Sequence, residues 1–189
     1  YGSSGQTVST CSGACVAGYY CPAGSSSPTQ NQCGGADKYC PTGSGSAASV
    51  SSGYYSTGGE YANVRTGQDI CPKGSYCSSG LKTSCPAGKY GDTTGLTTSA
   101  CSGSCQEGYL CPIDSTSKTQ EPCGTGSKPQ QFYCPAGSGS RSTVSSGHYT
   151  LPEDGSLYHR TSEATCGSGY VCADGVRTPN IVYNNCPDG

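Results

Sequence analysis

The feature that most constrains this 189-residue chain is its set of 16 cysteines, which recur as two matching groups of eight. The offset between the groups grows from 90 to 101 residues, so small insertions separate otherwise fixed positions. The matching pairs are Cys11 and Cys101, Cys15 and Cys105, Cys21 and Cys111, Cys33 and Cys123, Cys40 and Cys134, Cys71 and Cys166, Cys77 and Cys172, and Cys85 and Cys186. Such self-similarity indicates a tandem duplication. We therefore expect one cysteine-rich repeat over 1–89 and a second over 90–189, which can continue into a further repeat or the next subunit.

Disulfides between the cysteines have to provide the stability that a hydrophobic core provides in most proteins. Leu, Ile, Val and Phe together number 17, about 9% of the chain. At about 25 cal/mol per Å² of buried apolar surface, so few side chains cannot offset the conformational entropy lost on folding. A disulfide that closes a loop of about 15 residues contributes roughly 3 kcal/mol. Disulfides at this density persist in oxidising compartments, so we expect an extracellular or cell-surface protein.

Zinc binding is the alternative use of these cysteines. Cys11-x3-Cys15 and Cys101-x3-Cys105 have a ligand-like spacing. The even number of cysteines and their regular recurrence favour disulfides for all sixteen, so we expect neither a metal nor a cofactor.

A short motif, Cys-Pro-x-Gly, punctuates both repeats. Proline fixes φ and glycine supplies a positive φ, so each copy predicts a tight turn. The motif begins at Cys21, Cys40, Cys71, Cys85, Cys134 and Cys186. No window keeps a helical period for more than two turns, whereas runs such as Tyr54-Tyr-Ser and Asn180-Ile-Val-Tyr183 indicate short hairpins. The expected fold class is small and disulfide-rich, mostly irregular with short β-hairpins, elongated through its tandem repeats, and with little or no helix.

The 15 tyrosines, set against the single Phe132, suit thin modules. A tyrosine ring can pack on a neighbouring disulfide while its hydroxyl stays in water. An exposed tyrosine ladder that packs subunits together is the alternative.

Signatures of other functions are missing from the sequence. It has no phosphate-binding glycine loop, nucleophile elbow or His-Glu-x-x-His motif, so we expect no enzyme activity. His148 and His159 have no partner cluster and are interpreted as surface residues, and Glu153-Asp154 lacks the alternating oxygen ligands of a calcium loop. The net charge of −2 gives no reason to expect nucleic acid as a partner. No apolar run approaches the roughly 18 residues of a membrane span, so direct membrane insertion is not expected.

Cys85-Pro-Ala-Gly-Lys-Tyr-Gly91, followed by Thr- and Ser-rich residues up to Cys101, resembles the cysteine-rich repeat of Eph-type receptor ectodomains. Related modules occur in large surface proteins of protists and algae and resemble the cysteine-rich domains of tumour-necrosis-factor receptors. The resemblance implies rod-like, non-enzymatic modules that stack end to end. It also implies a disulfide between Cys85 and Cys101.

The resemblance leads to a hypothesis about assembly. Cys186-Pro-Asp-Gly189, one further residue and Tyr1-Gly2 would rebuild the motif that begins at Cys85. We therefore expect a piece of a longer array or a filament subunit that associates with itself end to end. In this arrangement Cys186 pairs with the Cys11 equivalent of the next copy, and not with Cys166 or Cys172.

Glycosylation is the modification that the composition favours, because 50 residues are Ser or Thr and no Asn-x-Ser/Thr sequon is present. Unmodified flexible loops are the alternative. The O-glycan candidates are Ser25, Ser26, Ser27, Thr29, Thr93, Thr94, Thr97, Thr98, Ser115 and Thr116.

The expected function is structural: a subunit or repeat segment of an extracellular filament, a flagellar-hair-like appendage or a surface coat, rod-like and O-glycosylated. The alternative is a spacer or ligand-binding segment of a receptor or adhesin ectodomain. A secreted toxin or inhibitor is disfavoured, because such proteins are usually compact and shorter than one repeat here.

Overall fold

The structure, a computed structural model, describes residues 1–4 and 11–180. The chain divides into two compact units. Unit 1 comprises Tyr1–Cys85 and Gly91–Cys101, and unit 2 comprises Pro86–Tyr90 and Ser102–Gly189. Residues 86–90 therefore fold with the second unit, although they precede the last residues of the first.

The expected fold class is confirmed: the chain is disulfide-rich and largely irregular, with short two-stranded hairpins and little helix. Within the described residues, helix is limited to two single turns of 3-10 helix, η1 (Ala62–Val64) and η2 (Pro129–Gln131). No helix in that part of the chain is long and apolar enough to cross a membrane. The regular structure consists of two-stranded antiparallel sheets.

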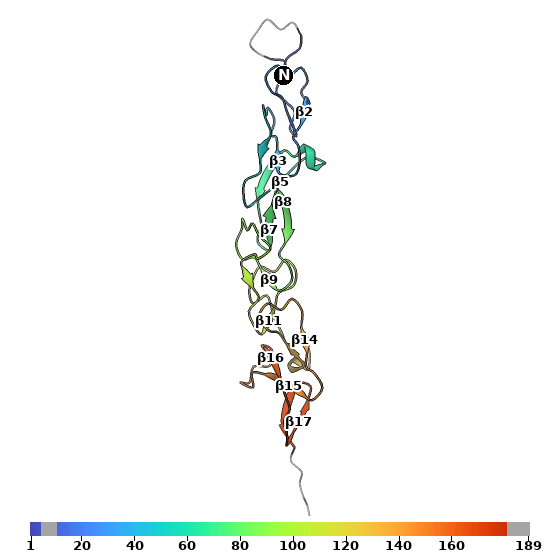
Figure 1. Ribbon diagram of the computed structural model, residues 1–189, viewed down its shortest axis with the longest axis vertical. Coiled ribbons are helices and arrows are strands. Elements are labelled where there is room, and N and C mark those ends of the chain that lie inside the picture. Colours follow the sequence, from blue (N-terminus) through green and yellow to red (C-terminus); the bar gives the residue numbers. More distant parts are fainter. Residues whose placement is uncertain (5–10, 181–189) are drawn as a thin grey trace, which may run out of the picture. The chain divides into compact units, whose positions relative to one another are not determined.

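Unit 1 contains four hairpins, which follow one another in the order of the chain from the blue β2 to the green β8 (Figure 1). β1 pairs with β2, β3 with β4, β5 with β6 and β7 with β8. The strands are β1 (Tyr19–Tyr20), β2 (Asn31–Gln32), β3 (Lys38–Tyr39), β4 (Ala48–Ser49), β5 (Tyr54–Thr57), β6 (Gly67–Ile70), β7 (Ser75–Ser78) and β8 (Leu81–Ser84).

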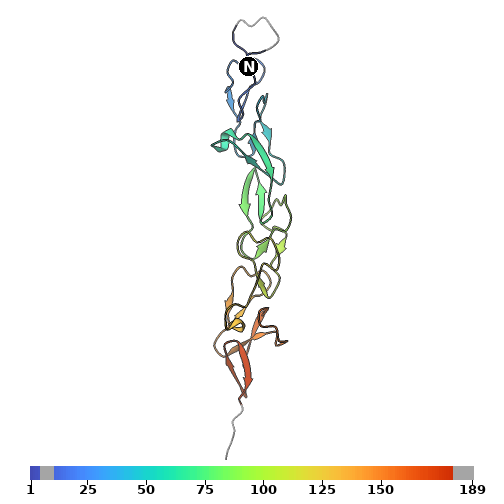
Figure 2. The same cartoon turned by 180° about the vertical axis from the view of Figure 1, so that it is seen from behind.

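Unit 2 repeats this series and adds one short ladder, formed by β9 and β10. Its hairpins also follow the order of the chain, up to the red β17 and β18 (Figure 2). The strands are β9 (Lys89–Tyr90), β10 (Gly103–Ser104), β11 (Tyr109–Leu110), β12 (Glu121–Pro122), β13 (Phe132–Tyr133), β14 (Ser142–Thr143), β15 (His148–Leu151), β16 (Ser162–Thr165), β17 (Tyr170–Ala173) and β18 (Val176–Pro179). Each of the four hairpins of unit 1 has a counterpart here.

The last hairpin of each unit turns through two residues with positive φ. In β17–β18 these are Asp174 (φ 53°) and Gly175 (φ 79°), and in β7–β8 they are Ser79 (φ 50°) and Gly80 (φ 73°). Such loops match the right-handed twist of the strands that they join. The Gly175 carbonyl accepts the Thr150 N–H at 2.9 Å, and the Thr150 hydroxyl, which is buried, donates to the Gln130 carbonyl at 2.8 Å. The polar side chain of Thr150 is thus buried with its hydrogen bond satisfied.

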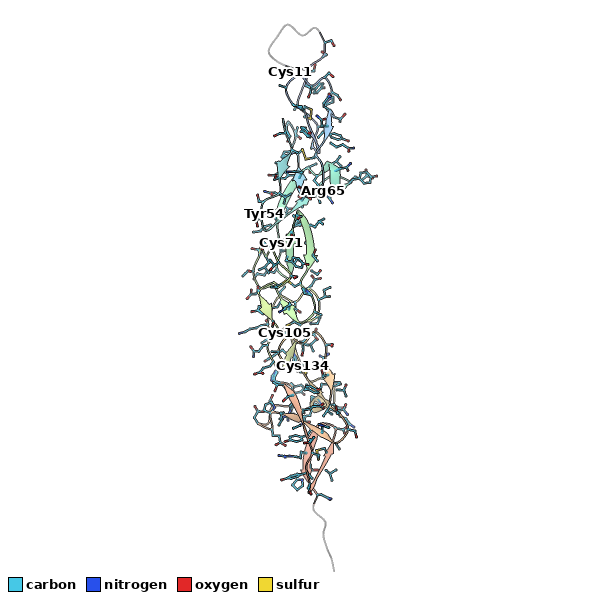
Figure 3. All side chains as sticks on the ribbon, viewed as in Figure 1. Cys11, Tyr54, Arg65, Cys71, Cys105 and Cys134 are labelled. Atoms are coloured by element: carbon cyan, nitrogen blue, oxygen red, sulfur yellow. A yellow bond between two sulfur atoms is a disulfide. The ribbon has the colours of Figure 1, made fainter. Side chains whose placement is uncertain are left out.

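The interior of both units is built around sulfur. Most of the buried residues with apolar side chains are cysteines, and the side chains of each unit spread outward around its ribbon (Figure 3). The hydrophobic cluster of unit 2 joins Leu110 to the Cys123–Cys134 disulfide, with Phe132 packed against it. A disulfide therefore takes the place that aliphatic side chains hold in an ordinary core.

One polar contact recurs in both units with different chemistry. In unit 2 the backbone N–H of Ser145 donates to Glu163 Oε2 at 2.6 Å, and the Ser145 hydroxyl donates to Oε1 at 2.9 Å. In unit 1 the Ser51 N–H donates at 2.7 Å to the amide oxygen of Gln68, which cannot titrate. The hydrogen bond from the Ser145 backbone is the largest cause that lowers the pKa of the half-buried Glu163 carboxyl.

This difference predicts a pH response that is confined to one repeat. A lowered folded-state pKa means that the contact stabilises the fold above the usual pKa of a glutamate and that this contribution is lost as pH falls through the folded pKa. We expect the amide proton resonance of Ser145 to shift in this acid range and that of Ser51 to stay constant. NMR titration of both amides checks this, and a matching shift at Ser51 would contradict it.

Candidate functional site

The described cysteines form seven disulfides, and each one joins cysteines 6 to 16 residues apart in the sequence. Three pairings of the first repeat recur at the corresponding positions of the second. These are Cys15–Cys21 and Cys105–Cys111, Cys33–Cys40 and Cys123–Cys134, and Cys71–Cys77 and Cys166–Cys172. Disulfides at this density suggest a secreted or extracellular protein.

The seventh disulfide joins Cys85 to Cys101, the pair that the resemblance implies. It links the last cysteine of the first repeat to the first cysteine of the second. Cys11, the counterpart of Cys101, is exposed and has a free thiol among the described residues. Figure 3 shows Cys11 and Cys71 far apart within unit 1. Among the described residues, Cys11 thus has no disulfide partner, whereas Cys101 is bonded to Cys85.

Residues around Cys11 reproduce the surroundings of Cys101. In the β9–β10 ladder Tyr90 pairs with Gly103, and its carbonyl accepts the Ser102 N–H at 2.8 Å. In the first repeat the Tyr1 carbonyl accepts the Ser12 N–H at 2.9 Å, and the Tyr1 amino group donates to the Gly13 carbonyl at 3.0 Å. Tyr1 therefore occupies the place that Tyr90 holds in the second repeat.

A recurring backbone hydrogen bond joins a glycine to the first cysteine of most of the described disulfides. The carbonyl of a glycine with positive φ accepts the N–H of the first cysteine of the pair at 2.8–3.0 Å. This bond is found for six of the seven described disulfides. The glycine and cysteine pairs are Gly18 and Cys33, Gly53 and Cys71, Gly74 and Cys85, Gly88 and Cys105, Gly108 and Cys123, and Gly147 and Cys166. We call these residues the capping glycines.

The exception is the Cys15–Cys21 disulfide. Its counterpart, Cys105–Cys111, is capped by Gly88 of the Cys85-Pro-Ala-Gly motif. Within the described residues the Cys15 N–H has no glycine partner. The described residues thus supply neither a glycine cap for Cys15 nor a partner for Cys11, whereas the Cys85-Pro-Ala-Gly turn supplies both for Cys105 and Cys101. Sequence reasoning identified the motif as a turn but missed that Gly88 caps Cys105, because these two residues are remote in the sequence.

Cys186 lies outside the described residues. The Cys85 N–H bonds to the Gly74 carbonyl at 2.8 Å, and in unit 2 the corresponding bond, to the Gly169 carbonyl at 2.9 Å, comes from Asn180. Asn180 therefore corresponds to Cys85 with an offset of 95 residues. The offset of 101 residues between Cys85 and Cys186 arises from residues that follow Asn180 in the sequence. Cys166 and Cys172 are bonded to each other, so neither is available to Cys186.

The zinc alternative does not hold for the paired cysteines. Cys15, Cys101 and Cys105 are each in a disulfide and so supply no thiolate. Across residues 1–4 and 11–180, no group of three or more His, Cys, Asp or Glu side chains is placed to hold a metal ion.

The histidines and the acidic pair make ordinary contacts. The His159 ring lies on the Tyr109 ring with centroids 4.6 Å apart, and His148 Nδ1 is 3.1 Å from the Ser146 carbonyl. Glu153 forms an ion pair with Arg177 at 2.8 Å. The Arg177 guanidinium also lies over the rings of Tyr149 and Tyr170, a cation–π arrangement that fixes this corner of unit 2.

The O-glycan candidates differ in exposure. Thr93, Thr94, Thr97 and Thr98 are exposed in one loop of unit 1, as are Ser26, Thr29 and Thr116 elsewhere, and Ser27 is half-buried. Ser25 and Ser115 are buried, and their hydroxyls donate at 2.7 Å to the carbonyls of Pro22 and Pro112. A sugar on these two hydroxyls would break a turn, so they are withdrawn as candidates.

No known family model matches the chain, and neither the curated proteins nor the solved structures contain a significant match.

The capping geometry gives a prediction for Gly88→Ala. The added methyl carbon would lie 2.3 Å from the Gly137 carbonyl oxygen, and the φ of +85° disfavours any residue with a side chain. We expect the free energy of unfolding to fall by about 2–4 kcal/mol, as measured by urea denaturation.

Gly24→Ala is the matched control. Gly24 has a φ of +87°, but its added methyl carbon would meet no atom within 4 Å. We expect only the conformational cost of about 1–2 kcal/mol. Equal losses for the two variants would show that the contact of Gly88 contributes nothing.

Proposed function

We propose that this chain is a structural segment of an extracellular filament, a flagellar-hair-like appendage or a surface coat, in which cysteine-rich repeats are joined in series by disulfides. The observation that carries the proposal is the free thiol of Cys11 at the position where Cys101 is bonded to Cys85. Among the described residues, one disulfide thus joins the two repeats, and Cys11, the counterpart of Cys101, is exposed with a free thiol.

The repeated pairing pattern supports a series of repeats. The three disulfides internal to the first repeat recur in the second, so each repeat carries its own covalent framework. Among the described disulfides, Cys85–Cys101 joins a cysteine of the first repeat to a cysteine of the second. Repeats built in this way can be added without changing those already present, because each needs only its neighbour.

The chemistry suits a material exposed to the extracellular medium. Short disulfide loops limit the entropy of the unfolded chain and hold the fold without a large apolar core. The proposed role is mechanical and needs no catalytic group.

The test is the covalent state of the purified chain in a glutathione redox buffer. We expect non-reducing gels to show a ladder of multiples of 19.0 kDa that collapses to a single band after reduction. Cys11→Ser removes the ladder and leaves the seven internal disulfides intact, because Cys11 takes part in none of them.

Negative-stain microscopy of the oxidised material should show polymers that are absent from the Cys11→Ser sample. A wild-type chain that stays monomeric, with the Cys11 thiol free or bonded within its own chain, would contradict the proposal. That outcome would favour the alternative role as a spacer or binding segment of a receptor or adhesin ectodomain.

We also propose that the exposed threonines carry O-linked sugar, which would cover the weakly charged surface. Thr93, Thr94, Thr97 and Thr98 form the densest exposed group among the candidates, in a single loop of unit 1. We expect the intact mass of the natural protein to exceed 19.0 kDa and to fall when all four are replaced by Ala. A mass equal to that of the bare chain would contradict this prediction.

A further inference from the structure

The turn at Ala87–Gly88 shows how a Cys-Pro-x-Gly motif docks on a repeat. Within unit 2 the Gly88 N–H donates to the Cys111 carbonyl at 2.8 Å, and the Gly88 carbonyl accepts the Cys105 N–H at 2.9 Å. One glycine therefore bonds to both cysteines of one disulfide. The turn and the Cys105–Cys111 disulfide thus form a two-bond backbone clasp.

The clasp requires a close approach that only small residues permit. A methyl carbon added to Gly139 would lie 2.6 Å from Ala87 Cβ and 2.9 Å from the Gly88 nitrogen. Gly139 thus lies directly beneath the docked turn, and any larger residue there would displace the turn.

The first repeat has the same arrangement of backbone groups around its first disulfide as the one that receives the turn in unit 2, and we call this arrangement the receiving frame. The Gly43 N–H donates to the Cys15 carbonyl at 2.8 Å, as the Gly137 N–H does to that of Cys105. The Cys21 N–H donates to the Ser44 carbonyl at 2.9 Å, as the Cys111 N–H does to that of Ser138 at 3.0 Å. The frame is therefore formed without a docked turn.

The frame of the first repeat is open among the described residues. There the Cys15 N–H and the Cys21 carbonyl make no backbone hydrogen bond, whereas their counterparts bond to Gly88. Cys21 is half-buried, whereas Cys111 is completely buried. A methyl carbon added to Gly45, the counterpart of Gly139, would meet only the Cys21 carbonyl oxygen, at 4.0 Å. Buried backbone groups are normally paired, so this surface has the form of an unfilled interface.

A cavity adjoins this frame. It has a volume of about 370 Å³ and is bordered by Tyr1, by Cys11 with its free thiol, and by Cys21 with the turn that follows it. Because Tyr1 occupies the place of Tyr90, the elements that the described residues of the first repeat do not supply are a cysteine for Cys11 and a glycine for Cys15.

We propose that the Cys15 N–H, the Cys21 carbonyl and the face of Gly45 form an acceptor surface for the Cys186-Pro-Asp-Gly189 segment of a second copy of this chain. This inference rests on the proposed function and names the contact through which the copies join. The sequence of this segment contains both elements, a cysteine to bond Cys11 and a glycine that corresponds to Gly88. The occupant is a second copy because its motif is the counterpart of the segment that fills the same frame in unit 2.

The covalent step is a thiol–disulfide exchange. The Cys11 and Cys186 thiols form one S–S bond, and one molecule of oxidised glutathione is reduced to two thiols, which take up the two protons. Docking of the turn holds the two sulfur atoms together and so favours this disulfide over others.

The experiment joins two chains that can each react at one position only. Donor chains carry Cys11→Ser, and acceptor chains carry Cys186→Ser. They are mixed in a glutathione redox buffer, and the dimer is quantified on non-reducing gels, with its disulfide located by peptide mapping. We expect a single dimer that is bonded between Cys11 and Cys186.

The deciding variant is Gly45→Ala in the acceptor chain. The free acceptor accommodates the methyl group, but a docked turn would overlap it as Ala87 would overlap a methyl group on Gly139. We expect the equilibrium constant for dimer formation to fall by at least about tenfold. Gly67→Ala is the matched control, because its methyl carbon would lie at an ordinary 3.6 Å from Thr57 Oγ1, away from this surface. It should leave the constant unchanged.

The outcomes separate this inference from the proposed function. A Cys11–Cys186 dimer that Gly45→Ala leaves unaffected, or a dimer bonded through other cysteines, overturns the acceptor surface while the structural role stands. Dimerisation of the variant pair that is sensitive to Gly45→Ala supports the surface even if the natural material proves not to be a polymer. Failure of the donor and acceptor chains to dimerise overturns the inference.

Discussion

The hydrogen bond between the carbonyl of a capping glycine and the first cysteine of a disulfide is the contact on which the packing of both units depends. Each disulfide closes a short loop, but a closed loop alone does not position the segment that follows it. The capping glycine ties the following disulfide to a preceding turn, and its positive φ lets the backbone approach closely. Because the contact is made by backbone atoms, the side chains around it can vary between the repeats.

This arrangement explains how the chain can fold with so few aliphatic residues. The buried positions are held largely by cysteines, and polar residues such as Thr150 are buried with their hydrogen bonds made. The free energy of folding therefore depends on disulfide-closed loops and hydrogen-bonded backbone groups more than on the burial of apolar surface. Among the described residues, the backbone groups of Cys15 and Cys21 that correspond to those bonded by Gly88 in the second repeat make no such hydrogen bonds.

The duplication, the turn motif and the scarcity of helix could be predicted from the sequence, because each depends on local residue types. The pairing of Cys85 with Cys101 followed from a resemblance to a known module and not from the spacing. The capping of Cys105 by Gly88 could not be predicted, since nothing local distinguishes this glycine from others in the motif. The burial of Ser25 and Ser115 was also missed, because a serine in a Ser-rich segment gives no sign that its hydroxyl closes a turn. The tertiary position of Asn180 showed that the second repeat departs from the first before Cys186.

The sequence by itself determined that this protein is a disulfide-stabilised duplication, because the number and periodicity of cysteines are independent of how the chain packs. Only the tertiary structure decided which carbonyl meets which amide, and hence that the frame filled by Ala87–Gly88 in the second repeat is open in the first. The physical reason is that a backbone hydrogen bond between remote segments is specified by geometry, and the same glycine, cysteine and proline letters occur in the filled and the open copy.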